Sequence, residues 1–278
     1  MNPFALDRSV AVVTGGGNGI GQATALALGA AGASVAVLDR DGHAAAAVCD
    51  ELSAAGIPAL GIGVDVTDRP RVDAAIASVA DGLGVPTVVV ANAGYGRFGA
   101  FVDIEPRVWQ RHLDVNLTGT FHVVQSAVRV MSNGGSIVLT GSTASSFPCD
   151  LFSAYATTKA GVAMLARSLA AELGPRRIRV NAVLPGVIQS AMTESILDDP
   201  TTRRLVEQET PLGRVGEPSD VADVIVFLAS DASRYVTGNA ILVDGGQTTH
   251  GFPRWFSVDA AAGGEYGSHG ERMAAFAT

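Results

Sequence analysis

Tyr155 and Lys159 have the residue types and the spacing of a proton-transfer pair. They lie four positions apart at the start of a predicted helix, so their side chains share one face. A free tyrosine has a pKa of ~10, too high for an efficient base near neutral pH, and a nearby ammonium group should lower it. Ser142 precedes Tyr155 by 13 residues, just after a predicted strand. An isolated Tyr-x-x-x-Lys pair is usually ordinary helix surface. A Tyr-x-x-x-Lys pair preceded by a serine at the end of a strand is much rarer.

A glycine-rich turn follows the first predicted strand and indicates a dinucleotide site. The segment Thr14-Gly15-Gly16-Gly17-Asn18-Gly19-Ile20-Gly21 has glycines at the spacing G-x-x-x-G-x-G and opens a helix. A strand, a glycine turn and a helix let backbone N–H groups approach a pyrophosphate at the helix N-terminus. A glycine cluster alone is a weak signal, because turns use glycine without any ligand. Its place in a strand–turn–helix unit strengthens the interpretation.

An acidic residue at the end of the second predicted strand bears on which dinucleotide binds. Asp39 lies 18 positions after Gly21, where a carboxylate can accept hydrogen bonds from the adenosine ribose and repel a 2′-phosphate. The glycine turn contains Asn18 and no Arg or Lys, so the sequence favours NAD over NADP. On its own, Asp39 fits a strand-end turn equally well, and Arg40 directly after it could soften the discrimination.

Seven short apolar runs alternate with longer Ala- and Leu-rich stretches. Nearly continuous apolar runs are typical of parallel strands buried on both faces, and their alternation with helices predicts βαβ units. The predicted strands are Val10–Thr14, Ser34–Leu38, Ala59–Val64, Thr87–Ala91, Ser136–Thr140, Ile178–Val183 and Ala240–Val243. The predicted helices span residues 19–31, 43–55, 69–82, 105–131, 154–173 and 218–230. The polar segment 190–211 has no predicted helix and stands where ligand-binding loops occur in such sheets.

The composition argues against several classes of function. Of 278 residues 47% are apolar, and 19 Lys and Arg against 27 Asp and Glu give a net charge of −8. Nucleic-acid or anionic-membrane partners would need a basic patch, so neither is expected. The two cysteines and five histidines lack metal-ligand spacing, and no metal site is expected. No signal peptide or membrane span is apparent, so the expected compartment is the cytoplasm.

The motifs and their order resemble those of the short-chain dehydrogenase/reductase family, in its single-domain form with a Tyr-x-x-x-Lys active site. The resemblance extends from about Ser9 to Gly246 and rests on Thr14 to Gly21, Asp65-Val66, Asn92-Ala93-Gly94, Asn116, Ser142, Tyr155, Lys159, Pro185-Gly186, Pro211 to Arg214 and Asp244-Gly245-Gly246. Two small departures are Ala91, where Asn often opens the Asn-Asn-Ala-Gly motif, and Ser190, where many members have Thr. The resemblance implies a three-layer α/β Rossmann fold, with a seven-stranded doubly wound parallel sheet and helices on both faces. One domain is expected over residues 1–248, followed by a C-terminal extension, 249–278.

The resemblance also implies a role for each motif residue. Tyr155 would be the general acid/base, Ser142 would hold the substrate oxygen, and Lys159 would bind the nicotinamide ribose. Asn116 would hold a water that links Lys159 to solvent, unless it only bends or caps its helix. Asp65 fits an adenine contact or the cap of the following helix. The residues implied for cofactor binding are Gly15, Gly17, Asn18, Gly19, Ile20, Asp39, Arg40, Asp65, Val66, Asn92, Ala93, Gly94, Tyr155, Lys159, Pro185, Gly186, Ile188 and Ser190.

The expected reaction is the NAD(H)-dependent interconversion of a secondary alcohol and a ketone, with an apolar or alicyclic skeleton as the first hypothesis and a polyol or sugar as the alternative. Candidate substrate contacts are Tyr95, Ser142, Phe147, Cys149 and Met192, a mostly apolar set that disfavours a phosphorylated substrate. Members of the family usually form tetramers through two long helices, here 105–131 and 154–173, so a homotetramer is expected.

Two other functions fit the same sequence. An NADPH-dependent 3-oxoacyl-carrier-protein reductase shares the whole catalytic set, although Asp39 and the absence of a basic residue in the glycine turn count against NADPH. A non-catalytic dinucleotide-sensing protein would keep the fold but should lack the tyrosine or the lysine, and both are present.

Overall fold

A seven-stranded parallel sheet organises residues 2–249, the part of the chain that the computed structural model describes. Its strands lie in the order β3-β2-β1-β4-β5-β6-β7, and every neighbouring pair is parallel. The strands are β1 (Val10–Thr14), β2 (Ser34–Asp39), β3 (Ala59–Gly63), β4 (Val88–Ala91), β5 (Gly135–Thr140), β6 (Ile178–Pro185) and β7 (Ala240–Val243). The predicted fold class is therefore confirmed.

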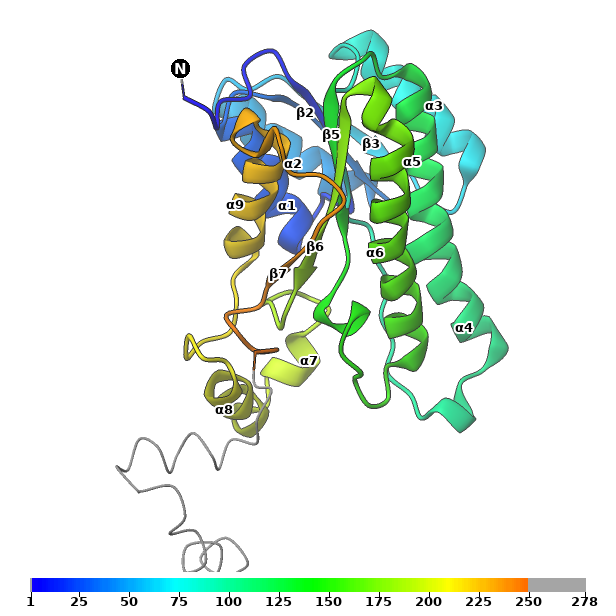
Figure 1. Cartoon of the computed structure of the whole chain (residues 1–278), viewed down its shortest axis with the longest axis vertical. Helices are drawn as coiled ribbons and strands as arrows, with labels where there is room; N and C mark the ends of the chain where they lie inside the picture. Colours follow the sequence, from blue (N-terminus) through cyan, green and yellow to red (C-terminus); the bar gives the residue numbers. More distant parts are fainter. Residues whose placement is uncertain (1, 250–278) are drawn as a thin grey trace, which may run out of the picture.

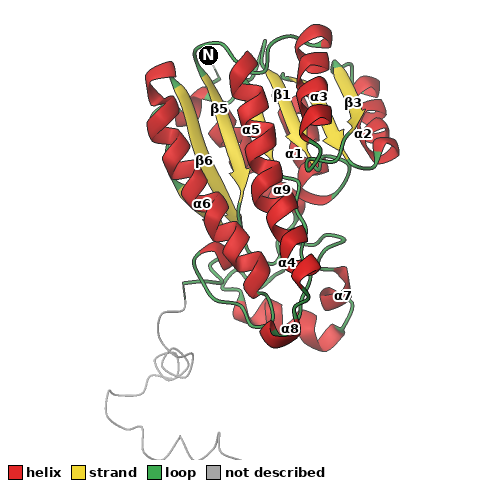
Figure 2. Ribbon diagram, turned by 90° about the vertical axis from the view of Figure 1, so that its right-hand side faces the viewer, coloured by secondary structure: helices red, strands yellow, loops and turns green. Residues whose placement is uncertain are grey.

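Helices cover both faces of the sheet and make the molecule three-layered (Figure 1 and Figure 2). On one face lie α1 (Gly19–Ala30), α2 (Gly42–Ala54) and α9 (Pro218–Ala229). On the other lie α3 (Arg69–Gly82), α5 (Gly119–Val130) and α6 (Ser153–Leu173). α4 (Pro106–His112) leads into α5, and the connection from β6 to β7 contains α7 (Glu194–Leu197) and α8 (Pro200–Glu209).

Each central strand divides its side chains between two cores. In β1, Val10 and Val12 join the core under α3, α5 and α6, whereas Ala11 and Val13 join the core under α1, α2 and α9. Successive side chains of a strand point to opposite faces, so a strand covered on both sides needs apolar residues at every position. This requirement explains why unbroken apolar runs predict these strands.

Aspartate side chains begin three of the helices. Asp41 caps α2, Asp68 caps α3 and Asp199 caps α8, each accepting hydrogen bonds from backbone N–H groups of the first turn. α7 and α8 lie within residues 190–211, where no helix is predicted from the sequence. The Asp199 cap and Pro200 at the first helical position begin α8 although the segment is polar.

The prediction of one regular helix over residues 105–131 is wrong. α4 and α5 are joined by a π-helical turn, Leu113–Thr118. Within it Asn116 turns its side chain to the backbone of Tyr95, and the Thr120 hydroxyl donates to the Asn116 carbonyl oxygen at 2.7 Å. A π turn holds one extra residue per turn, which the apolar pattern of a long helix does not reveal, and such turns are frequent at functional sites.

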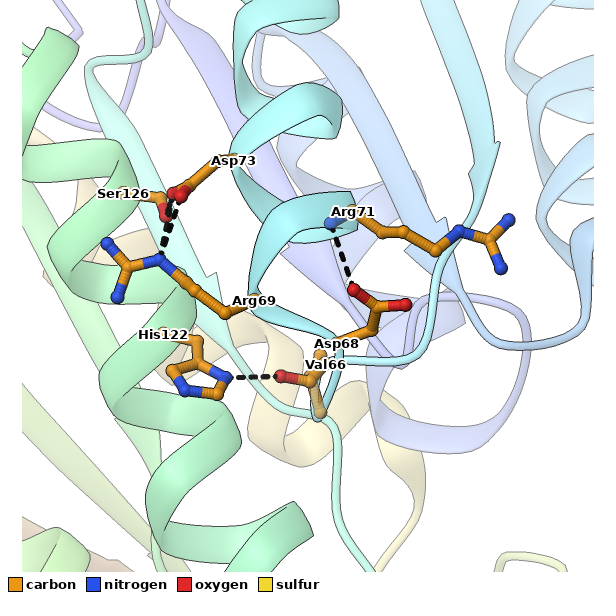
Figure 3. Close-up of polar contacts among 7 residues, drawn as sticks. All are labelled: Val66, Asp68, Arg69, Arg71, Asp73, His122 and Ser126. Carbon is orange, nitrogen blue, oxygen red and sulfur yellow. Dashed lines mark hydrogen bonds and ion pairs between the residues drawn. The ribbon is translucent and has the colours of Figure 1, made fainter.

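Polar contacts between α3 and α5 hold the chain that follows β3. In Figure 3 the side chains of Arg69 and Ser126 both reach the carboxylate of Asp73, and Arg69 Nε lies 2.9 Å from Asp73 Oδ1. His122 Nδ1 lies 3.0 Å from the carbonyl oxygen of Val66. Because Val66 belongs to the predicted cofactor site, this contact fixes part of that site to α5.

The strand order determines where a ligand can bind. From β1 the sheet extends through β2 and β3 on one side and through β4 to β7 on the other. Ligands of such sheets bind at the carboxyl ends of the strands, beside the point where the order reverses. The predicted site residues follow β1, β2, β3, β4, β5 and β6, all at this edge.

The described residues allow two further statements. Between residues 2 and 249, no helix is long and apolar enough to cross a membrane, and no three His, Cys, Asp or Glu side chains gather in a way that could hold a metal ion. The extension expected at 249–278 lies outside the described residues except for residue 249, so the division of the chain near residue 248 stays a prediction.

Candidate active site

A cleft of about 440 Å³ opens at the carboxyl edge of the sheet. The predicted cofactor residues that line it are Gly15, Asn18, Gly19, Ile20, Asp39, Arg40, Asp65, Val66, Asn92, Ala93, Gly94, Tyr155, Lys159, Pro185, Gly186, Ile188 and Ser190. Ser142, Tyr95, Cys149 and Met192 line it as well. Gly17, Asn116 and Phe147 stand outside this lining. The structure thus brings together residues from six loops that are far apart in sequence.

Backbone geometry shapes the glycine turn. Gly15 has a φ of 61°, and a Cβ at this position would lie 2.9 Å from the Cα of Ala93. A Cβ at Gly21 would lie 1.9 Å from the carbonyl oxygen of Gly15, so the turn closes only with glycine. α1 begins here without a side-chain cap, unlike α2, α3 and α8. The first N–H groups of a helix have no intrahelical partner, and here they fit a pyrophosphate.

The Asp39 carboxylate is held by two backbone amides. Its Oδ2 accepts a hydrogen bond from Gly17 N–H and its Oδ1 accepts one from Asp41 N–H, both at 3.0 Å. Asp39 therefore forms the strand-end turn that is its alternative role, and it also lines the cleft. A carboxylate oxygen can accept more than one hydrogen bond, so both remain able to bind ribose hydroxyls.

Asp65 contacts Thr67 and Arg111. Its Oδ1 accepts hydrogen bonds from Thr67 N–H at 2.9 Å and from the Thr67 hydroxyl at 2.7 Å, and Arg111 Nη2 lies 3.4 Å from its Oδ2. Burial alone would raise the pKa of Asp65, but the bonds from Thr67 and the charge of Arg111 lower it overall. Arg111 also lines the cleft and is not predicted from the sequence, because only the fold brings α4 to the end of β3.

Asn92 ties three strand ends together. Its Nδ2 donates to the carbonyl oxygens of Thr14 and Gly15, each at 3.2 Å, and its Oδ1 accepts from the Thr140 hydroxyl at 3.2 Å. β1, β4 and β5 are thereby joined by one amide group at the edge of the cleft. Besides lining the cleft, Asn92 positions the glycine turn.

Asn116 is fully buried and bonded to the protein through both atoms of its amide. Its Oδ1 accepts from Tyr95 N–H at 2.7 Å, and its Nδ2 donates to the Tyr95 carbonyl oxygen at 2.9 Å and to the Thr158 hydroxyl at 3.0 Å. A Cβ on Gly94 would lie 3.6 Å from both Asn116 Oδ1 and Lys159 Nζ. Asn116 therefore fixes the loop after β4 beside Lys159, and its part in binding a water stays a prediction.

Tyr155 and Lys159 lie in the first two turns of α6 and are almost completely buried, with 8% and 3% of their surfaces exposed. Lys159 Nζ donates to the Thr140 carbonyl oxygen at 2.6 Å and lies 5.6 Å from the centre of the Tyr155 ring. Burial raises the pKa of Tyr155 to about 12, against an opposing hydrogen bond with Ser142, and burial lowers the pKa of Lys159 to about 8.

Burial therefore raises the pKa of Tyr155, and the lowering expected from Lys159 and the positive nicotinamide ring of the bound cofactor stays a prediction. Removing a phenol from water disfavours its charged form, and this effect outweighs its hydrogen bond. Lys159 is itself easier to deprotonate for the same reason. A sequence shows which groups are neighbours in the chain, but burial depends on the assembled fold.

The lowered pKa of Lys159 makes stability depend on pH. Between about 8 and its ordinary value of 10.5, the unfolded chain carries one more proton on Lys159 than the folded chain, so stability rises with pH. From about pH 7 to about pH 9.5, we expect the free energy of unfolding to rise by about 2 kcal/mol more in the wild type than in Lys159→Met. Urea titrations at a series of pH values measure this free energy, and an equal rise with pH in the two proteins would contradict the prediction.

Ser145 connects Ser142 to Lys159 and is not predicted from the sequence. The Ser145 hydroxyl accepts from Ser142 N–H at 3.2 Å and donates to the Lys159 carbonyl oxygen at 2.9 Å. The Ser142 hydroxyl accepts from Ala144 N–H at 3.1 Å. The spacing of a short capping box, Ser142 to Ser145, is the signal that could have identified it.

Replacing Ser145 with alanine should weaken catalysis more than cofactor binding. Two hydrogen bonds, each worth about 1 kcal/mol, then no longer hold the Ser142 turn against α6. We expect kcat to fall about tenfold, the NADH dissociation constant to stay within about twofold, and Ser145→Thr to restore kcat. Ser146→Ala, at the exposed neighbouring position, is the matched control. Equal kcat values for Ser145→Ala and Ser146→Ala would refute this role.

Two further residues of the cleft lie near Tyr155 and in the chain after β6. Phe152 and Thr193 line the cleft and are not predicted from the sequence. The Thr193 hydroxyl donates to the Ile188 carbonyl oxygen at 2.6 Å and accepts from Ser190 N–H at 3.1 Å, so it shapes the backbone at two residues implied for cofactor binding. Phe152 is the N-cap residue of α6 and stacks on the Tyr155 ring, a contact that only the assembled structure shows.

Comparisons with known proteins agree with this geometry. The family model described as enoyl-(acyl carrier protein) reductase matches residues 15–248. An L-rhamnose 1-dehydrogenase (NAD(P)(+)) of Sphingomonas sp. is 41% identical over 246 residues, which cover 87% of this chain and 96% of that protein. The 2-(S)-hydroxypropyl-CoM dehydrogenase 3 of Xanthobacter autotrophicus is 39% identical over 251 residues, which cover 87% of this chain and 98% of that protein.

Solved structures agree as well. A short-chain type dehydrogenase/reductase from Mycobacterium marinum superposes with a TM-score of 0.85 at 38% identity, over 89% of this chain and 98% of that one. The order of the strands, the cleft at their carboxyl edge and these similarities identify the chain as a member of the short-chain dehydrogenase/reductase family.

Proposed function

We propose that this oxidoreductase uses NAD(H) to interconvert a secondary alcohol and a ketone. The observation that carries the proposal is the position of Tyr155, a buried phenol beside Lys159, in the same cleft as Ser142 and the glycine turn. Membership of the family supports oxidoreductase chemistry with a nicotinamide dinucleotide. What we propose beyond this is that the dinucleotide is NAD and that the substrate is a secondary alcohol.

In the proposed reaction, each site residue has one task. A nicotinamide dinucleotide held in this cleft would supply the hydride acceptor for alcohol oxidation and the hydride donor for ketone reduction. Tyr155 takes the proton of the substrate hydroxyl, and in the reverse direction it returns the proton to the ketone oxygen. Ser142 donates a hydrogen bond to that oxygen and stabilises its developing charge. Lys159 holds the nicotinamide ribose, and the N–H groups that begin α1 hold the pyrophosphate.

Asp39 supports NAD as the preferred form of the cofactor. Its carboxylate is fixed at the end of β2 by Gly17 and Asp41, so it cannot turn away from a 2′-phosphate without losing two hydrogen bonds. A phosphate beside a carboxylate is disfavoured by like charge. Arg40 lines the same cleft and would reduce the discrimination without reversing it.

The first experiment measures nicotinamide absorbance with the purified full chain. NAD⁺ and NADP⁺ are offered separately with a panel of secondary alcohols, cyclic diols, hydroxysteroids and sugars. We expect reduction of NAD⁺ with at least one secondary alcohol, at a kcat/KM above that for NADP⁺. Preference for NADP⁺ would refute the assignment of the cofactor, and failure to oxidise any alcohol would refute the proposed reaction.

One rival function has a specific observation in its favour. A 3-oxoacyl-[acyl-carrier-protein] reductase of Aquifex aeolicus is 37% identical to this chain over 245 residues. A reductase of 3-oxoacyl groups on that carrier would use NADPH and the same Ser142, Tyr155 and Lys159. Rapid reduction of acetoacetyl-CoA with NADPH, without oxidation of free alcohols by NAD⁺, would favour it. A dinucleotide sensor without catalysis has no such support, because the catalytic set is complete.

We also infer that the protein assembles as a homotetramer. The apolar side chains of Phe121 on α5 and Met164 on α6 are exposed on the helices through which tetramers of the family form. Covering such surface stabilises an assembly. Light scattering of the full chain should give the mass of four chains, and Met164→Glu should lower it. A wild-type mass of one chain would contradict the inference.

A further inference from the structure

Three aromatic rings form a continuous stack at the catalytic end of the cleft. The ring centres of Tyr155 and Phe152 lie 4.2 Å apart at an interplanar angle of 13°, and those of Phe152 and Phe98 lie 4.1 Å apart at 13°. Phe98 and Phe152 both line the cleft. The stack runs from the buried Tyr155 outward to Phe98, which is 46% exposed, so apolar surface leads from the reacting group toward solvent.

The stack is held by contacts between two loops. Gly99 N–H donates to the Leu151 carbonyl oxygen at 2.8 Å, which joins the loop carrying Phe98 to the loop carrying Phe152. A Cβ on Gly96 would lie 3.1 Å from Phe152 Cζ and 3.3 Å from Met192 Sδ, so the chain packs closely against both side chains. The two phenylalanines therefore form a wall of fixed position.

Charge is distributed unevenly along the cleft. The charged side chains among its described lining residues are Asp39, Arg40, Asp65, Arg111 and Lys159. The first four lie at the ends of β2 and β3 or on α4, in the half of the cleft assigned to adenosine. Lys159 directs its ammonium group to the Thr140 carbonyl oxygen. No carboxylate or guanidinium among residues 2–249 thus lines the catalytic half, where a charged or densely hydroxylated substrate would need partners.

We propose that Phe98 and Phe152 form a specificity wall that selects uncharged secondary alcohols carrying an apolar ring next to the carbinol carbon. This inference rests on the proposed function and names its substrate class. Tyr155 and Phe98 cover the two faces of Phe152, so the stack presents ring edges to the cleft. An apolar ring of the substrate can lie across these edges, where it buries apolar area and makes edge-to-face contacts. A small alcohol reaches Tyr155 without touching Phe98, and a sugar would leave hydroxyl groups against the wall without hydrogen bonds.

The test compares two substrates within each protein. Indanol and isopropanol are oxidised with NAD⁺ by the wild type, Phe152→Ala, Phe98→Ala and the matched control Phe101→Ala, whose ring is exposed and outside the cleft lining. We expect the ratio of kcat/KM for indanol to that for isopropanol to fall about tenfold or more in the first two variants and to stay constant in the control. A general disturbance of Tyr155 would slow both substrates and leave the ratio unchanged, so the ratio isolates specificity.

L-rhamnose and gluconate serve as polar probes in the same assay. A wild-type preference for either over indanol would overturn the specificity wall while leaving the proposed alcohol oxidation intact. An unchanged substrate ratio in both Phe152→Ala and Phe98→Ala would overturn it as well. If the wild type oxidises another alcohol of the wider panel but not indanol, the specificity wall alone fails. If it binds NADH and oxidises no alcohol of that panel, the proposed function fails as well.

Discussion

Tyr155→Phe should lower kcat/KM for alcohol oxidation by about 10²–10⁴-fold, the range that a positioned acid/base group contributes. The substitution removes only the phenolic oxygen, so the ring can keep its stacking contact with Phe152. Dinucleotide binding should therefore survive. We expect the NADH dissociation constant, measured by fluorescence titration, to stay within about twofold of the wild-type value.

A matched control exists on the surface of the same chain. Tyr235 is fully exposed, and Tyr235→Phe should leave kcat/KM and NADH binding unchanged. Residual activity of Tyr155→Phe above about a tenth of wild type would show that another group transfers the proton. Loss of NADH binding together with activity would indicate that the substitution disturbs the site rather than the proton transfer.

Asp39→Asn should shift the preference from NAD⁺ toward NADP⁺. The variant keeps a side-chain oxygen for one of the two backbone amides that hold Asp39, but it removes the charge that repels a 2′-phosphate. A hydrogen bond to a charged group is worth about 1.5–3 kcal/mol, so we expect the ratio of kcat/KM for NAD⁺ to that for NADP⁺ to fall about 10–100-fold. Initial rates at several concentrations of each cofactor, at constant ionic strength, measure this ratio.

Asp41→Asn provides the same change of charge two residues further on. Asp41 caps α2 and does not line the cleft, so its variant should leave the cofactor ratio unchanged. If the two variants shifted the ratio equally, the selectivity would follow from the general charge near β2 and not from contact with Asp39. If neither shifted it, Asp39 would be only the strand-end turn that its spacing also allows.

The sequence predicts those parts of the site whose residues lie close together in the chain. Tyr155 and Lys159 depend on one helical turn, and the glycine turn depends on its own backbone, so local spacing is sufficient to find them. Arg111 and Asp65, by contrast, meet only after α4 packs beside the end of β3, and no local pattern records that contact.

The strands could be predicted from the sequence, whereas the π turn and the pKa of Tyr155 depend on the assembled fold. The regular strands follow from apolar runs because burial on both faces leaves little choice of residue. The π turn around Asn116 has helical dihedral angles at its ends and differs from a regular helix by one residue, so the sequence pattern predicts only the helix. The raised pKa of Tyr155 is set by the atoms that surround it, and those come from several loops.

The amide of Asn92 has a consequence for how quickly the protein engages its cofactor. Because it links the ends of β1, β4 and β5, contacts within the protein itself hold the edge of the cleft together. Conformational entropy at this edge is lost during folding and need not be lost again on binding. Association with the dinucleotide should then follow a single exponential whose rate rises in proportion to concentration, as in encounter with a preformed surface.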